Sequence, residues 1–410
     1  MSTHYLSIPE VAESLELSIK AVRRKIANGE IVASKIGNAY HIAASDLTQY
    51  KNNPKPQIYD KRALSIPPDP STAPNWIDIS GFWNVQKNSE MTYVDLFCGA
   101  GGLSKGLEMA GLHGICGLDW FKEAGLTYNR NFEHPFIYGD IKDSTVKQRF
   151  YEEVRNRLNG RELDIVAGGF PCQGFSMAGN RVVDDPRNSL YLELVEIVKE
   201  LQPRFVICEN VKGLRSMLGG HVEHKIVDDF RSIGYNMNIA VLCAADYYTP
   251  QKRERVIFIG NRIGIKNYHP KPILQPEQYV TTGEAIGDLM TRPCEESFNH
   301  VPTKHSPEMQ KRIEEVPEGK SLYKGYSDAW KKCPWNEASC TIKENHGGVN
   351  LHPKLGRVLT AREMARLQSF PDSFIFEGTK NKQLVQIGNA VPPLLGKAIG
   401  LAIRYANKDL

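Results

Sequence analysis

Short apolar runs alternate with longer amphipathic stretches between Met91 and about Gly260, and this alternation limits the possible folds more than any other feature. The runs have the length of buried strands, and the stretches between them have the length and apolar spacing of helices. The predicted strands cover residues 93–97, 113–118, 136–138, 163–167, 205–208, 239–242 and 256–259. The predicted helices cover residues 103–110, the stretch up to about 130, 146–158, 190–201 and 222–233. Strands that alternate with helices indicate an α/β fold whose mostly parallel sheet is covered on both faces.

The first three predicted strands end in residues that suit a nucleotide-like ligand. The first leads into a glycine-rich turn from Asp95 to Gly102, where glycines let the backbone approach a ligand, although a plain tight turn explains them equally well. The second strand ends in Asp119-Trp120 and the third in Asp140-Ile141. Carboxyl ends of parallel strands share one edge, where an acid can hold ribose hydroxyls and an indole can stack on adenine. Together these strand ends predict an adenosyl ligand.

A stiff turn that carries a cysteine follows the fourth predicted strand, from Gly168 to Ser176. Pro171 fixes its own φ and pushes Phe170 toward an extended conformation, so the turn is stiff where the thiol of Cys172 must be aimed. A lone cysteine is more often a buried core residue. Polar and glycine residues follow Cys172 at once, however, and this favours a thiol that faces a loop.

Two further groups of polar residues lie near strand ends and could act together with Cys172. Glu209 ends the fifth predicted strand, and a thiolate beside a carboxyl group suits covalent catalysis by a nucleophile and a proton donor. A surface glutamate that caps the next helix is the alternative. Strand alternation would point Gln251, Arg253 and Arg255 to one side before the last predicted strand, although a solvated charged edge explains them too.

Residues 1–50 predict a small separate unit that begins with two short helices. Ser7 and Glu10 have the spacing of a capping box at the start of the first helix. Ser18 is placed to cap a second helix over residues 19–27, which carries three consecutive basic side chains.

Two short strands are predicted to follow, near residues 31–34 and 39–42, around a turn at Gly37-Asn38. Two helices and a hairpin form a winged helix-turn-helix, and the segment resembles the excisionase and MerR-like DNA-binding modules. The second helix of such modules enters the major groove. The candidate DNA contacts are Arg23, Arg24 and Lys25. Because acidic residues offset the basic ones, a protein-binding module with a solvated basic helix is the alternative.

The remaining segments are less regular. Prolines spread among polar residues predict a semi-extended linker over residues 51–90, and its apolar residues Trp76, Phe82 and Trp83 are expected to dock it onto the next domain. Residues 261–350 lose the alternating pattern and predict a smaller, irregular domain. The last segment, 383–406, ends in a helix.

Composition limits the cellular setting. Eight cysteines form no CxxC pair and no paired His/Cys spacing, which argues against a structural zinc site or a disulfide framework and favours a reducing cytoplasm. The N-terminus has no features of a signal peptide, and no apolar run is long enough to span a bilayer, so we expect a cytoplasmic, nucleoid-associated protein. The net charge of +4 over 410 residues permits a polyanionic partner without indicating one.

From Met91 to the C-terminus the chain resembles the DNA (cytosine-5)-methyltransferases, because six blocks occur in that family's order. The blocks are the glycine turn at Asp95, Pro171-Cys172-Gln173, Glu209-Asn210-Val211, Gln251-x-Arg253-x-Arg255, the segment from Arg357 to Pro371, and Gln386-Ile387-Gly388-Asn389-Ala390-Val391-Pro392-Pro393. The resemblance implies a Rossmann-like sheet that binds S-adenosyl-L-methionine and releases S-adenosyl-L-homocysteine. It also implies a catalytic domain at 91–260, a small target-recognition domain at 261–380, and a return to the catalytic domain at 381–410.

The resemblance further implies a role for particular residues. Cys172 would add to C6 of a flipped-out cytosine, Glu209 would bond N3, and Arg253 and Arg255 would support the base and the intermediate. Residues that would hold the cofactor are Asp95, Phe97, Gly99, Gly101, Asp119, Trp120, Asp140, Ile141, Phe170, Pro171, Leu190, Asn389 and Val391. Gln173 and Ser176 would contact DNA, and no metal is expected. The partners would be double-stranded DNA and a cognate restriction endonuclease that acts on the same site.

Three other functions stay open from the residues alone. An RNA cytosine-5 methyltransferase would use the same fold, although a helix-turn-helix favours DNA. A regulator that has lost catalysis would bind DNA through residues 1–50, but the presence of Cys172, Glu209 and Arg253 argues against it. An active methyltransferase whose N-terminal module also represses its own operon combines the two functions.

Overall fold

The computed structural model describes residues 5–15, 17–27, 31, 33–36, 39–45, 47–48, 66–84, 87–171, 189–323, 330–343 and 349–410. The chain divides into two compact units. The N-terminal unit contains Met1–Pro67, Cys172–Ser189 and Arg215–Glu223, and the large unit contains Pro68–Pro171, Leu190–Leu214 and His224–Leu410. None of the helices in these described ranges is long and apolar enough to cross a membrane.

The N-terminal unit contains the two predicted helices. α1 (Ile8–Ser14) begins after Ser7, whose backbone N–H donates to the Glu10 carboxylate at 2.7 Å, and α2 (Ile19–Ala27) begins after Ser18. The Oγ of Ser18 accepts a hydrogen bond from the N–H of Ala21 at 3.2 Å. Local capping therefore sets where both helices begin, as the sequence predicts.

The strands of this unit differ from the expected hairpin. β2 (Ser34–Ile36) pairs antiparallel with β3 (Ala39–Ala43), but a third strand, β1 (Tyr5–Leu6), pairs with the other side of β3. The prediction of a strand near 31–34 is wrong, because the strand begins only at Ser34. Ile31 lies before it and is buried in the core of the unit. β1 is too short to show a periodic pattern in the sequence, so only its pairing with β3 defines it.

The expected linker over 51–90 is folded from Pro68 onward, where the chain belongs to the large unit. β4 (Asn75–Ile77) forms a parallel pair with β12 (Tyr268–Pro270), and Ile79 is fully buried in the main core. Phe82 and Trp83 pack against the same core. Because the partner strand lies far along the chain, the local proline-rich composition does not reveal β4.

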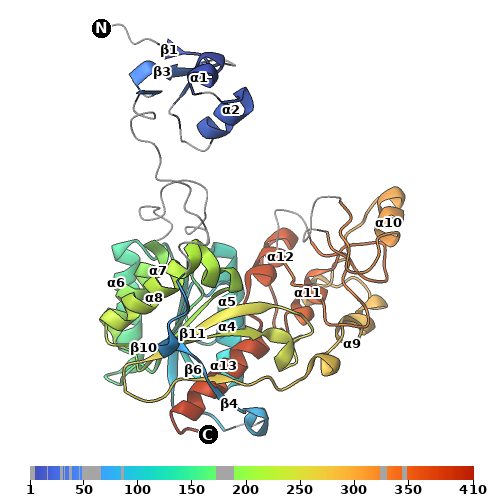
Figure 1. Cartoon of the computed structure of the whole chain (residues 1–410). Coiled ribbons are helices and arrows are strands. Elements are labelled where there is room, and N and C mark those ends of the chain that lie inside the picture. The colour runs from blue at the N-terminus through green and yellow to red at the C-terminus, as the bar shows by residue number, and fades with distance from the viewer. Residues whose placement is uncertain are drawn as a thin grey trace. The chain divides into compact units, whose positions relative to one another are not determined.

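A seven-stranded sheet in the order β10-β11-β9-β8-β5-β6-β7 forms the centre of the large unit (Figure 1). Its strands are β5 (Thr92–Leu96), β6 (His113–Asp119), β7 (Phe136–Tyr138), β8 (Ile165–Gly168), β9 (Phe205–Val211), β10 (Asn236–Cys243) and β11 (Glu254–Asn261). Strands β5 to β9 are parallel, whereas β11 is antiparallel to β9 and β10. The predicted α/β fold with a mostly parallel sheet is confirmed.

The strand order reverses between β5 and β8. The chain runs outward from β5 through β6 to β7, and then returns to β8 on the other side of β5. Open α/β sheets bind their ligands outside the carboxyl ends of the strands at such a reversal. The carboxyl ends of β5 and β8 are therefore the place where a site is expected.

Helices cover both faces of this sheet. They are α4 (Gly102–Met109), α5 (Lys122–Asn131), α6 (Ser144–Leu158), α7 (Ser189–Leu201), α8 (His221–Ser232) and the C-terminal α13 (Pro393–Ala406). α4 and α13 share an apolar cluster with one set of strand residues, which includes Tyr93, Ile165 and Ile257. Strand residues of the opposite parity, such as Val94 and Val166, are also fully buried, as expected when both faces are covered.

The region after residue 261 contains short helices and few regular strands among its described residues. The helices are α9 (Thr282–Ile286), α10 (Pro307–Glu314), α11 (Ala361–Leu367) and α12 (Lys380–Asn389). In Figure 1, α9, α10 and α11 gather beside the sheet, and the chain then returns to the sheet through α13. One apolar cluster contains Tyr128 of α5, Phe132 at the end of α5, and Phe370 and Phe374 of the later region. This region therefore shares its core with the sheet domain.

Candidate active site

The predicted chemical residues lie in adjacent positions at the carboxyl edge of the parallel strands. Leu96 pairs in register with Leu118 on one side and Gly168 on the other, and Gly168 pairs with Cys208. The next residue along the chain after each of these four is Phe97, Asp119, Gly169 or Glu209, respectively. The register therefore brings the glycine turn, the second strand end and Glu209 to one edge, at the strand reversal.

The turn after β5 has a left-handed backbone that Asp119 holds in place. Phe97, Gly99 and Gly101 have φ angles of 56°, 52° and 91°. The N–H of Gly99 donates to Oδ2 of Asp119 at 2.8 Å, and the N–H of Phe121 donates to Oδ1 at 2.8 Å. Burial raises the pKa of Asp119 above its ordinary value. The two turns are thus tied together by one buried carboxyl group.

Three observations in this part of the sheet fit an adenosyl cofactor. A Cβ atom at Gly99 would meet nothing within 4 Å, so the turn leaves open space beside its backbone. Trp120 directly follows β6 and is 72% exposed, which is unusual for an indole and leaves its face free to stack. At the next strand end Ile141 is buried, while Asp140 is exposed and accepts from the N–H of Lys142 at 3.0 Å.

The C-terminal part of the chain lies against the same glycine turn. A Cβ atom at Gly102, the first residue of α4, would collide with the carbonyl oxygen of Val391 and would lie 3.0 Å from the Cβ of Ala390. Val391 is nearly buried and Asn389 is exposed. Only glycine at position 102 allows this close approach. The backbone of residues 390–391 thus packs against the start of α4, directly after the glycine turn.

Glu209 and Arg255 form an ion pair across β9 and β11. Nε of Arg255 lies 2.8 Å from Oε1 of Glu209, and both side chains are about nine-tenths buried. In the antiparallel register Glu209 faces Ile257 and Arg255 faces Val211, so the two charged residues are diagonal neighbours on one face. A Cβ at Gly169 would lie 3.1 Å from Oε2 of Glu209, so the carboxylate touches the backbone shortly before Cys172. Cys172, Gln173 and Ser176 lie outside the described residues.

Arg253 has a different environment from Arg255. Its guanidinium is buried and donates to the carbonyl oxygens of Ile342 at 3.0 Å and Gly388 at 3.1 Å. Its Nε has no partner among the described residues, and burial lowers the pKa of the Arg253 guanidinium well below its ordinary value. β11 begins only at Glu254, so of Gln251, Arg253 and Arg255 only Arg255 lies in the strand, and strand alternation does not apply to the other two.

Gln251 is also buried and joins three segments. Its Oε1 accepts from the N–H of Ile342 at 2.8 Å, and its Nε2 donates to Gln368 at 2.8 Å and to the carbonyl of Leu367 at 3.1 Å. Gln251 and Arg253 thus attach the region around residue 342 and the last helices to the start of β11. Their contacts are those of structural supports for the edge on which Glu209 and Arg255 lie.

Asp95 lies at the start of a buried hydrogen-bond chain that sequence reasoning missed. It accepts from Oγ of Ser104 at 2.6 Å, that hydroxyl lies 2.9 Å from the hydroxyl of Tyr128, and Tyr128 lies 2.8 Å from Nε2 of His134. Burial raises the pKa of Asp95 to about 7 and lowers that of His134 to about 4. No spacing in the sequence relates these residues, because they come from β5, α4, α5 and the segment after α5.

The remaining predicted residues of the site have the following surroundings. Phe170 is buried, and its carbonyl accepts from Nδ2 of Asn210 at 2.8 Å. Pro171 is exposed and Leu190 is half-buried. In the N-terminal unit α2 carries the candidate DNA contacts, of which Arg23 is exposed and Lys25 is half-buried, while the side chain of Arg24 lies outside the described set.

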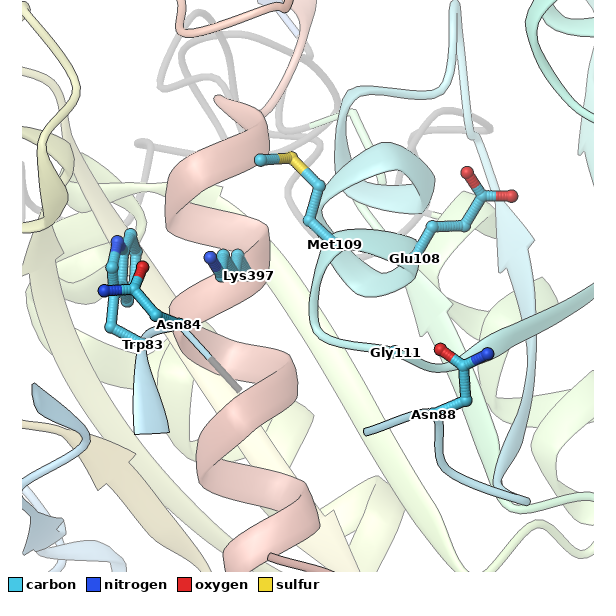
Figure 2. A pocket seen from close by; sticks show the side chains of 7 residues that line it. All are labelled: Trp83, Asn84, Asn88, Glu108, Met109, Gly111 and Lys397. Atoms are coloured by element: carbon cyan, nitrogen blue, oxygen red, sulfur yellow. The ribbon is translucent and has the colours of Figure 1, made fainter. Parts of the chain in front are cut away.

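A cavity of about 520 Å³ lies at the other end of α4 (Figure 2). Its lining residues are Trp83, Asn84, Asn88, Glu108, Met109, Gly111 and Lys397. Lys397 lies with its Nζ 4.4 Å from the ring centre of Trp83. Since α4 begins at the glycine turn and ends at Met109, this cavity is remote from the edge that carries Glu209 and Asp119.

Comparison with known proteins agrees with this geometry. Residues 91–404 match the family described as C-5 cytosine-specific DNA methylase, and residues 5–54 match a helix-turn-helix domain. The chain is 36% identical over 335 residues to the Type II methyltransferase M1.HphI of Haemophilus parahaemolyticus, covering 78% of this chain and 88% of that protein. It is 31% identical to the Type II methyltransferase M.Eco47II of Escherichia coli, covering 97% of this chain and 94% of that protein.

Solved structures share the fold of the large unit. An Escherichia coli prophage protein described as a DNA modification methyltransferase matches with a TM-score of 0.63 and 25% identity, over 78% of this chain and all of that chain. The Entamoeba histolytica methyltransferase EhMeth matches with a TM-score of 0.57 and 17% identity, over 79% of this chain and 99% of that chain. The chain belongs to the C-5 cytosine-specific DNA methylase family: it is a DNA cytosine-5 methyltransferase with an N-terminal helix-turn-helix domain.

Proposed function

We propose that this protein transfers a methyl group from S-adenosyl-L-methionine to C5 of a cytosine that has been flipped out of duplex DNA. The observation that supports this most directly is the position of Glu209. Its carboxylate is paired with Arg255 at 2.8 Å and touches the backbone of Gly169, close in sequence to Cys172. Glu209 thus lies at the sheet edge that carries the glycine turn, and Cys172 follows in the sequence four residues after β8, which ends at that edge.

The cofactor would be held at the strand reversal. We assign its methionine part to Phe97, Gly99 and Gly101, its ribose to Asp119 and its adenine to Trp120. Asp140, Ile141, Phe170, Pro171, Leu190, Asn389 and Val391 would complete the site. When bound, S-adenosyl-L-methionine supplies an electrophilic methyl group. The exposed indole of Trp120 and the open space at Gly99 support this placement. Asp95, which is buried against Ser104, would act indirectly by holding the start of α4 beneath the turn.

The protein's own residues would activate the base. C5 of cytosine is a weak nucleophile, and addition of the Cys172 thiolate to C6 gives C5 enamine character. Glu209, with a proton on its carboxyl group, would donate a hydrogen bond to N3 and stabilise the negative charge that develops there, while Arg255 contacts and orients this carboxyl group. Loss of the C5 proton would then expel Cys172. In a stacked duplex the neighbouring bases cover the ring faces that the thiolate and the methyl donor must approach, so the base must be flipped out.

Methyl transfer from labelled S-adenosyl-L-methionine to unmethylated duplex DNA tests this proposal, followed by cytosine-conversion sequencing of the product. We expect incorporation at C5 of one cytosine in a defined sequence. Folded protein that binds the cofactor but labels no duplex would contradict the proposal. The same assay with transfer RNA distinguishes an RNA methyltransferase, which would label only that substrate.

We also propose that residues 1–50 form a second DNA-binding module. The helix-turn-helix match and the exposed Arg23 on α2 support this. The module would add affinity for DNA or repress the protein's own operon. Promoter footprinting with and without this segment tests it, and identical footprints would contradict it.

The names of the relatives suggest the biological setting. M1.HphI and M.Eco47II are named Type II methyltransferases. We propose that this protein likewise acts in the bacterial cytoplasm, where it protects host DNA from a restriction endonuclease of the same site specificity. DNA methylated by the protein should resist cleavage by an endonuclease that recognises the sequence found by conversion sequencing.

A further inference from the structure

Two cysteine thiols face each other in the region after residue 261, away from Cys172 in the sequence. Sγ of Cys333 lies 4.0 Å from Sγ of Cys340, and neither is in a disulfide. Cys333 is fully buried, whereas Cys340 is partly accessible to solvent. Disulfide formation needs the sulfur atoms to approach to about 2.05 Å, so the gap to be closed is about 2 Å.

The backbone around both cysteines is fixed by hydrogen bonds. The N–H of Cys333 donates to the carbonyl of Leu351 at 3.2 Å. On either side of Cys340, the N–H of Ser339 donates to the carbonyl of Pro250 at 3.0 Å, and Oγ1 of Thr341 donates to that of Lys252 at 2.9 Å. Closure of the gap by rotation of the two cysteine side chains would leave these backbone contacts in place.

Cys340 has the features of an attacking thiolate. Its Sγ shares a hydrogen bond with the Cys333 thiol at 4.0 Å and accepts another from Nδ2 of Asn350 at 3.2 Å. The Cys333 hydrogen bond, the positive charge of Lys331 and the Asn350 amide lower the pKa of Cys340, although burial acts in the opposite direction. Partly exposed cysteines with a stabilised thiolate are the reactive ones, whereas buried thiols without such support are inert.

A metal site does not explain the pair. Within the described ranges of the chain, no group of three or more His, Cys, Asp or Glu side chains could hold a metal ion. Structural zinc needs four ligands of this kind. Two neighbouring thiols without further ligands are instead the arrangement found in thiol–disulfide exchange.

We propose that Cys333 and Cys340 are a redox-active pair that exchanges with small-molecule disulfides of the glutathione type. The Cys340 thiolate attacks one sulfur of the small disulfide, forms a mixed disulfide and releases one small thiolate. Cys333 then attacks Sγ of Cys340 while its proton passes to the departing small thiolate, which forms the Cys333–Cys340 bond and releases the second small thiol. The protein dithiol is oxidised by two electrons, and the small disulfide is reduced to two thiols.

The test uses the folded full-length protein and glutathione mixtures of defined ratio. After acid quenching, unfolding and alkylation, one tryptic peptide from Cys333 to Lys343 contains both thiols. We expect this peptide to lose two hydrogen atoms and to escape alkylation as the oxidised glutathione fraction rises, and to recover on reduction. Cys208 is a free cysteine that is fully buried in β9, and it should be alkylated after unfolding at every glutathione ratio. A Cys333–Lys343 peptide that is doubly alkylated at every ratio would overturn the proposal.

Two variants test which thiol attacks. In Cys333→Ser, Cys340 should accumulate the mixed disulfide with glutathione, because the resolving thiol is absent. In Cys340→Ser, Cys333 should stay reduced, since it is fully buried. Equal labelling of the remaining cysteine in both variants would overturn the assignment of Cys340. The readout is the mass of the peptide, so it does not depend on methyl transfer or on the proposed function.

Discussion

The N-terminal module folds from residues that are close in the sequence, whereas the candidate active site is assembled from residues that are far apart. Both helices of the module begin at a local serine cap, Ser7 or Ser18. In the large unit, Arg253 bonds to Gly388 across 135 residues, and β9 must pair with β11 before Glu209 meets Arg255. Changes in the module should therefore have local effects, and changes at the sheet edge should affect catalysis or the stability of the whole unit.

The largest effect should follow the loss of the nucleophile. Cys172→Ala is expected to lower methyl transfer by roughly 10⁴-fold or more, because the covalent addition to C6 is lost. Label incorporation under single-turnover conditions measures this, with gel shift as the measure of DNA binding. Cys294→Ala removes an exposed cysteine and is the matched control, which should retain full activity. Normal turnover by Cys172→Ala would contradict the covalent role of Cys172, and with it the expectation that changes at the sheet edge affect catalysis.

The next effect concerns the pH dependence of stability at Asp95. Burial raises the pKa of Asp95 in the folded protein to about 7 from 3.8. Between about pH 4 and 7 the folded state therefore holds a proton that the unfolded state has lost. The proton of Asp95 stabilises the folded state fully below about pH 4, and this contribution is lost as pH rises through about 7.

Asp95→Asn should remove this dependence, because asparagine can still accept from Ser104 but does not titrate. The free energy of unfolding of the variant, relative to wild type, should rise by about 4 kcal/mol at most between pH 4 and 8, since one pKa unit corresponds to about 1.4 kcal/mol. Urea denaturation across this range measures it. Curves that stay parallel for the two proteins would show that Asp95 does not couple to folding in this way.

A third effect tests the long-range ion pair at the sheet edge. Glu209→Gln is expected to slow methyl transfer by roughly 10²- to 10³-fold, and Arg255→Ala by less, with little change in cofactor affinity. Single-turnover rates and calorimetry separate the two quantities. Lys212→Ala breaks the neighbouring pair with Glu254, in which both side chains are about half exposed, and should leave the rate unchanged. Equal losses in Arg255→Ala and Lys212→Ala would contradict a specific role for Arg255.

A smaller effect is expected where the C-terminal segment meets the glycine turn. A methyl group at Gly102 collides with the carbonyl of Val391, so Gly102→Ala should destabilise the large unit by about 1–3 kcal/mol. Thermal unfolding measures this loss. Gly81→Ala is the control, because a Cβ there meets nothing within 4 Å. If both variants melt at the same temperature as wild type, residues 390–391 do not pack on the turn.

The smallest effect should come from the N-terminal module. Arg23→Ala removes one exposed cation from α2 and is expected to weaken DNA binding by roughly 3- to 10-fold and to lower its salt dependence, with no change in the rate of chemistry. Fluorescence anisotropy at several salt concentrations measures this. Glu13→Ala on α1 is the matched surface control. A change in single-turnover rate after Arg23→Ala would show that the module takes part in catalysis.

Local signals predicted the elements with good accuracy. α2 and β7 have the predicted bounds, and the alternation after Met91 yields the mostly parallel sheet. Caps, periodicity and glycine-rich turns act over a few residues, so they can be read directly. The order of the blocks also sufficed to predict the family, which the comparisons confirm.

The sequence by itself thus determined the α/β class, the position of most helices and strands, and the residue types at the strand ends. Only the tertiary structure decided that Arg255 meets Glu209 while Arg253 bonds to Ile342 and Gly388. It also decided that β4, which lies in the expected linker, pairs with the distant β12. The physical reason is that a strand's register and a buried side chain's partner depend on contacts with distant segments, whereas a cap or an amphipathic period depends on near neighbours alone.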